Sequence, residues 1–168
     1  AGGSIIAGGS IIAGGSIMAG GSIKADGYII ASKSIVAGGY IEAGWYIEAG
    51  EFIKASKFIK AGESIIAGGS IIAGGSIVAG GYIEAGWYIE AGWDIEAGEL
   101  FGITAGLSIT CKGTLSFGLK ASAGICSWKE VTEEEKTIAC GKLKGGVIEY
   151  GILKEAGIEE NVQSEMIK

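Results

Sequence analysis

The sequence has no histidine, no arginine and no proline among its 168 residues. Histidine is the usual general base near neutral pH and a member of most serine-type triads, so its absence argues against common hydrolytic and transfer chemistry. Without arginine, 13 lysines stand against 19 acidic residues and the formal net charge is −6. Phosphate binding needs clustered cations, so we expect no direct nucleic-acid ligand. A basic protein, or one that itself binds nucleic acid, suits the charge better.

Cysteine is also scarce. Cys111, Cys126 and Cys140 are odd in number and lack the CxxC spacing of zinc sites. No histidine is present to complete a metal site, so we expect no metal and no cofactor. Unpaired cysteines are commonly small buried residues, and this usage fits a reducing, cytoplasmic location.

Charge is missing from residues 1–23, a stretch long enough to cross a membrane. The same six-residue phase nevertheless continues through Lys24, Lys33 and Glu42, which could not lie in lipid. One periodicity implies one architecture, so we expect no membrane span. The start also lacks the basic segment of a secretory signal.

What the sequence does contain is a six-residue unit, Ala-Gly-x-Ser/Tyr-Ile-x, repeated without interruption over residues 1–96. The fifth position is always isoleucine and the first always alanine, whereas the second is glycine except at Asp26, Ser32 and Ser56. On an extended strand an isoleucine and the alanine two residues later point to the same side. Glycine at the second and third positions supplies corners where the chain turns.

This pattern predicts an all-β fold, a parallel β-solenoid of short strands joined by glycine corners. A helix is excluded because a period of six matches no helical repeat, and two glycines per unit would cost about 1 kcal/mol each. Three units per turn give a triangular coil of about 18 residues, which we favour. Two units per turn give a flatter coil of about 12 residues, and neighbouring coils lie about 4.8 Å apart in either case.

The unit resembles that of left-handed hexapeptide β-helices, a large aliphatic residue followed by glycine or a small residue, two variable positions and another small residue. The resemblance covers roughly residues 1–110, although here alanine precedes the glycine and isoleucine stands where that family prefers a small residue. Many members of the family are acyltransferases with a catalytic histidine. This chain has none, so the resemblance implies the fold and not the activity.

The repeat degrades over residues 97–102, which predicts a solenoid over 1–102 and irregular coils with a small β or α+β cap over 103–168. Thr132-Glu133-Glu134-Glu135 matches a capping box, and we expect a short helix near 132–139. We also expect residues 147–153 to form a β-hairpin with residues 137–143 across Lys144-Gly145-Gly146.

We expect the residues that determine function to lie at the variable third, fourth and sixth positions of the unit. Residues 79–99 hold five acids and no lysine, and YIEAGWYIE at 40–48 returns 42 residues later at 82–90, an apparent duplication. The aromatic residues either stack in ladders between coils or form a binding surface rimmed by glutamate. We predict a partner-binding surface made of Trp45, Tyr82, Glu84, Trp87, Tyr88, Glu90, Trp93, Asp94 and Glu96.

The first six units place apolar side chains outward with Lys24 among them. An exposed apolar end of a solenoid is prone to pair with another chain. We therefore predict a homo-oligomer interface at Ile6, Ile12, Met18, Ile30 and Val36, unless the C-terminal third folds over this surface.

No catalytic residues are predicted, and the expected function is non-enzymatic binding to a protein. Pentapeptide-repeat DNA mimics are a precedent by analogy, and a phage or mobile-element inhibitor of a host nuclease or nucleic-acid-handling defence complex would have this character. The second hypothesis is a self-assembling solenoid or fibre element. The third is a hexapeptide-type transferase without its histidine.

Overall fold

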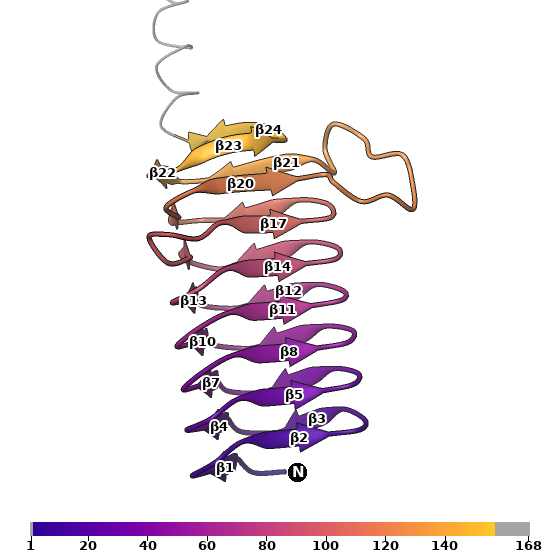
Figure 1. Ribbon diagram of the computed structural model, residues 1–168, viewed down its shortest axis with the longest axis vertical. Helices are drawn as coiled ribbons and strands as arrows, with labels where there is room; N and C mark the ends of the chain where they lie inside the picture. Colours follow the sequence, from indigo (N-terminus) through magenta and orange to yellow (C-terminus); the bar gives the residue numbers. More distant parts are fainter. Residues whose placement is uncertain (1, 157–168) are drawn as a thin grey trace, which may run out of the picture.

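The chain forms an all-β parallel solenoid, described for residues 2–156 by a computed structural model (Figure 1). Its 24 described strands make three sheets of eight parallel strands, and each strand of the repeat pairs with the strand 18 residues away, as Ile5 does with Ile23. The predicted triangular coil of three units per turn is therefore confirmed, and the flatter coil of two units is wrong.

The sheets that contain β1, β2 and β3 are called A, B and C, respectively. Sheet A stacks β1 (Ile5–Ala7), β4 (Ile23–Ala25), β7 (Ile41–Ala43), β10 (Ile59–Ala61), β13 (Ile77–Ala79), β16 (Ile95–Glu96), β19 (Thr114–Ser116) and β22 (Lys142–Lys144). Sheet B stacks β2 (Ile11–Ala13), β5 (Ile29–Ala31), β8 (Ile47–Ala49), β11 (Ile65–Ala67), β14 (Ile83–Ala85), β17 (Ile103–Ala105), β20 (Lys120–Ala123) and β23 (Val147–Tyr150). Sheet C stacks β3 (Ile17–Ala19), β6 (Ile35–Ala37), β9 (Ile53–Ala55), β12 (Ile71–Ala73), β15 (Ile89–Ala91), β18 (Ile109–Cys111), β21 (Thr137–Cys140) and β24 (Ile152–Glu155).

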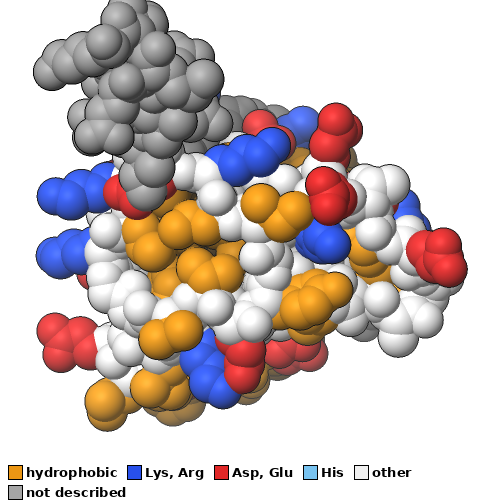
Figure 2. All heavy atoms as spheres, turned by 90° about the horizontal axis from the view of Figure 1, so that it is seen from above, with side chains coloured by type: hydrophobic (Ala, Val, Ile, Leu, Met, Phe, Trp, Pro, Cys, Tyr) orange, Lys and Arg blue, Asp and Glu red, His pale blue; other side chains and the backbone are white. Residues whose placement is uncertain are grey.

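The core is a continuous column of isoleucine and alanine. From Ile23 to Ile103 every isoleucine at the start of a strand is fully buried, and the alanine two residues later is nearly so. The residue between them faces outward, as the alternation of a strand requires. Seen from the end that carries β24, apolar side chains fill the middle of the coil and charged side chains lie at its rim (Figure 2).

The glycines of the repeat have a different role from the one predicted. Within the described chain the only glycines with positive φ are Gly124, Gly145, Gly146 and Gly151, all beyond the repeat. A Cβ on Gly44 or Gly62 would instead fall 2.0 Å from the carbonyl oxygen of the residue one coil earlier. The second position is thus small because successive corners stack closely, and not because the backbone turns through left-handed conformations.

The fourth position of the unit joins one coil to the next. The hydroxyl oxygens of Ser4, Ser22 and Ser64 accept hydrogen bonds from the backbone N–H at the same position one coil later, at 3.0–3.3 Å. Where this position is aromatic, rings stack instead: Tyr40 on Phe58 at 4.8 Å between centroids and Tyr28 on Tyr46 at 5.1 Å. For these two pairs, the predicted ladders between coils are confirmed.

The solenoid continues to Glu155, so its predicted end at residue 102 is wrong: the sequence repeat degrades there, but the architecture does not change. The expected hairpin is wrong: β21 pairs in parallel with β24 in sheet C, whereas β22 and β23 belong to sheets A and B. Gly145 and Gly146 form another corner of the coil, with φ of 76° and 65°. Residues 157–168 of the predicted cap lie outside the described part.

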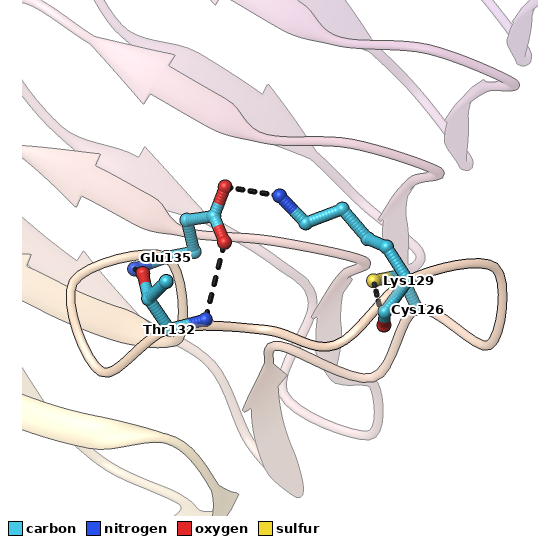
Figure 3. A network of polar contacts seen from close by, with 4 residues as sticks. All are labelled: Cys126, Lys129, Thr132 and Glu135. Carbon is cyan, nitrogen blue, oxygen red and sulfur yellow. Dashed lines mark hydrogen bonds and ion pairs between the residues drawn. The ribbon is translucent and has the colours of Figure 1, made fainter.

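The expected helix near 132–139 is also wrong. The capping-box contacts themselves form, since the Thr132 N–H donates to the Glu135 carboxylate and the Glu135 N–H donates to the Thr132 hydroxyl, at 3.1 and 3.2 Å (Figure 3). They close a single turn over residues 133–136, after which Thr137 begins strand β21. Ile138 enters the buried column above Ile109, and that burial outweighs the local helix signal.

Candidate interaction surface

An acidic belt surrounds the solenoid at one level. It consists of Glu84, Glu90 and Glu96, which are the exposed middle or end residues of β14, β15 and β16. These strands belong to sheets B, C and A respectively. Residues six apart in sequence therefore lie on successive faces, and the three carboxylates encircle the molecule instead of sharing one face.

The predicted aromatic residues lie at the edges between sheets. Trp87 and Tyr88 occupy the edge between sheets B and C, and Trp93 occupies the edge between sheets C and A. Glu90 on β15 thus lies between two tryptophans whose exposed fractions are 50% and 68%. Trp45 and Tyr82 both lie on the edge between sheets A and B, two coils apart from each other.

Asp94 has a structural contact that the sequence did not reveal. Its Oδ1 accepts a hydrogen bond from the Thr114 N–H of the next coil, at 2.7 Å. The hydroxyl of Ser76, at the same position of the unit, accepts a hydrogen bond from the Asp94 N–H in the same way. A Cβ on Gly113 would meet the Asp94 Oδ1 at 2.2 Å, which explains the small residue there. Asp94 therefore stabilises the stacking of its coil on the next one.

The outward columns of sheets A and C mix charges of both signs with apolar residues. On sheet A, Lys60 and Val78 separate Glu42 from Glu96, and Lys24 forms an ion pair with Glu42 at 3.1 Å. The hydrogen bond to Glu42 and its negative charge raise the pKa of Lys24 above its ordinary value. On sheet C, Ile72 lies between Lys54 and Glu90. Carboxylates therefore do not follow one another at the regular spacing of a phosphate backbone.

A loop over residues 124–136 leaves the solenoid between β20 and β21 (Figure 1). Trp128 in this loop contacts Trp87 at 5.8 Å between centroids, and the Lys129 ammonium lies 6.0 Å from the Trp128 ring. Lys129 also pairs with Glu135, and this hydrogen bond lowers the pKa of the Glu135 carboxyl (Figure 3). Sequence analysis missed Trp128, because nothing in the sequence shows that the loop folds toward a coil two levels away.

The predicted oligomer interface lies at the N-terminal end. Ile6, Ile12 and Met18 are 72%, 66% and 58% exposed, but they project from sheets A, B and C respectively. Ile30 lies above Ile12 in sheet B and Val36 above Met18 in sheet C, both half-buried. The apolar side chains thus ring the first coils and form a pair on each of two faces.

The three cysteines are free, with Cys111 and Cys140 buried and Cys126 half-buried. Burial is the main reason why the pKa of the Cys111 thiol rises to about 12, and burial likewise raises the pKa of Cys140. Both thiols therefore stay protonated and unreactive at neutral pH. Residues 2–156 contain no group of three potential metal ligands, and no helix in that part is long and apolar enough to cross a membrane.

No protein-family model, no curated protein and no solved structure matches the chain. What it can do must be inferred from its own surface.

Proposed function

We propose that this chain is a non-enzymatic binding protein whose acidic and aromatic surface occupies a site on another protein. By analogy, the partner is a host nuclease or another nucleic-acid-handling defence complex, and the chain serves a phage or mobile element in the cytoplasm. Such a partner carries basic surface, to which a chain of net charge −6 is attracted. No catalytic residue, cofactor or direct nucleic-acid contact is part of the proposal.

The arrangement of Trp87, Glu90 and Trp93 supports this function best. Two exposed tryptophans flank a strand whose outward residue is a carboxylate, all on rigid, hydrogen-bonded coils. Tryptophan dominates interface hot spots, and a rigid scaffold loses little entropy on binding. The mixed columns on sheets A and C favour such a local contact over imitation of a nucleic-acid backbone.

The test is capture of partners from host lysate by the tagged protein, followed by binding measurements with the purified captured protein. Reversal of Glu84, Glu90 and Glu96 to lysine should abolish capture, because it changes the sign of the belt. Trp93→Ala should weaken binding on the order of 30-fold, the loss typical of a hot-spot tryptophan.

The matched control reverses Glu42 and Glu48, which occupy equivalent positions on sheets A and B below the belt. This control should bind as the parent protein does. Capture that survives reversal of the belt, or that is lost equally in the control, would contradict the proposal.

The alternative function is structural, a self-assembling solenoid or fibre element. The exposed Ile6, Ile12 and Met18 support it, because open strand edges with apolar side chains favour association. Replacement of these three residues by lysine should then abolish assembly in light scattering and leave partner capture intact. A monomer at micromolar concentration in the parent protein would contradict this alternative.

The resemblance to hexapeptide β-helices belongs to the same proposal. It is supported by the 18-residue spacing between paired strands and by the six-residue unit. Without a histidine the chain lacks the family's catalytic residue, so we infer a hexapeptide-type scaffold used for binding.

A further inference from the structure

At two places a serine lies between aromatic residues one coil above and one coil below it: Ser64 between Tyr46 and Tyr82, and Ser70 between Phe52 and Tyr88. The second of these gaps borders a cleft. Tyr40 and Phe58 show how rings at the fourth position stack on the ring one coil away, 4.8 Å between centroids and nearly parallel at 6°. On the edge between sheets B and C, Phe52 and Tyr88 hold equivalent positions two coils apart, and the residue between them is Ser70. Two coil spacings of about 4.8 Å leave room for about one ring between them.

The cleft at this gap has a volume of about 540 Å³. Glycines at positions 68 and 69 keep its floor low, and most of its lining is apolar. The side chains around it are Glu51, Phe52, Lys54, Ser70, Ile72, Trp87 and Tyr88. The cleft therefore adjoins Trp87, which belongs to the predicted partner-binding surface.

Ser70 differs from the other serines of the same coil. Ser64 and Ser76 each accept a hydrogen bond from the backbone one coil later, both at 3.3 Å. The Ser70 side chain is only 6% exposed, and its hydroxyl makes no hydrogen bond within residues 2–156. No fully buried side-chain oxygen in that part lacks a partner, so the Ser70 hydroxyl is open to whatever enters the cleft. A ligand that donates a hydrogen bond to this hydroxyl oxygen would gain a polar contact in addition to ring stacking.

We propose that this cleft binds one planar aromatic side chain, tryptophan or tyrosine, of a protein partner. The ring stacks between Phe52 and Tyr88 in place of the missing ladder member, and its N–H or O–H donates a hydrogen bond to the Ser70 hydroxyl oxygen. Offset stacking and a polar group at the ring edge suit these two residue types. The inference rests on the proposed function only for the source of the ring, because the cleft borders the surface assigned to the partner.

The site is tested with N-acetyltryptophanamide and N-acetyltyrosinamide, titrated into the ¹⁵N-labelled full chain and followed by amide chemical shifts. We expect saturable shifts of Gly68, Gly69 and Ser70, with a dissociation constant on the order of millimolar for a single ring. N-acetylleucinamide has a similar backbone and no ring, and it should bind at least about tenfold more weakly.

Ser70→Phe supplies the missing ring from the chain itself. It should abolish the shifts while the thermal midpoint stays equal or rises, and Ser64→Phe, on another edge of the same coil, should leave the titration unchanged. Phe52→Ala removes one wall at an exposed position and should weaken binding about tenfold. Ser70→Ala should weaken the tryptophan amide several-fold and N-acetylphenylalaninamide little, because only the former donates to the hydroxyl.

The inference is overturned if neither aromatic amide gives saturable shifts, if the leucine amide binds equally, or if the shifts persist in Ser70→Phe. Retention of a captured partner by Ser70→Phe would likewise overturn the assignment of the ring to that partner. The titration needs no partner, so its failure is distinguishable from failure of the proposed function, which shows in the belt-reversal experiment alone.

Discussion

Gly62 lies directly above the carbonyl oxygen of Gly44, and an added Cβ would come within 2.0 Å of it. Gly62→Ala therefore forces the two corners apart, and we expect it to lower the free energy of unfolding by about 1–3 kcal/mol, as overpacked sites do. Chemical denaturation with a constant slope measures the loss. Asp26, Ser32 and Ser56 at the same position of the unit show that the corner can shift, so the protein should still fold.

Gly14→Ala is the matched control for this substitution. Gly14 has the same place in its unit, but a Cβ there would meet nothing within 4 Å. Its φ is not positive, so alanine should be neutral or should stabilise by about 0.5 kcal/mol through the unfolded chain. Equal losses at both positions would show that backbone conformation, and not close stacking, keeps glycine in the repeat.

The two isoleucines of strand β11 separate core from surface within one element. Ile65 is fully buried, whereas its neighbour Ile66 is only half-buried on the outer face. Ile65→Ala should cost about 2–5 kcal/mol, since it leaves a cavity in the continuous column. Ile66→Ala should cost less than about 1 kcal/mol, because the side chain loses little buried area. Similar costs measured by thermal or urea unfolding would contradict the inward column.

The elements that the sequence predicted correctly are those fixed by the period. Isoleucine and alanine two residues apart define the strands up to β16, and the outward phase of Glu84 or Glu90 follows from the same alternation. The elements beyond the repeat were mispredicted because a capping box and a Gly-Gly pair are local signals. Ile138 pairs with Ile109 and Leu153 pairs with Ile138; these contacts join neighbouring coils but residues far apart in sequence, so local patterns do not reveal them.

The candidate sites divide in the same way. Exposure of Trp87 and Trp93 follows from the repeat, so both could be predicted. The contact between Trp87 and Trp128, and the cleft at Ser70, depend on which residues lie 18 or 36 apart and on how a long loop folds. These neighbours can be worked out only when the number of units per coil is known, and the sequence left that number open between two and three.

At the scale of the whole molecule, the coil is the unit of folding. Each coil contacts mainly the coils above and below it, so stability should be close to a sum over coils and their interfaces. Deletion of residues 61–78 removes one full period of 18, and Ile83 then takes the place of Ile65 in sheet B. Every inward column is preserved, so we expect a folded, cooperative protein with a lower denaturation midpoint.

The same deletion removes Ser70 and brings Phe52 one coil below Tyr88. These two rings should then stack as Tyr40 and Phe58 do, which offsets part of the lost stability and eliminates the cleft. Deletion of residues 70–78 instead removes nine residues, which is one and a half units. Ile83 then falls at the position of Gly74, a glycine corner. This variant should lose its β-sheet circular dichroism. A nine-residue deletion that folds as well as the deletion of 18 would show that the six-residue phase does not fix the inner column.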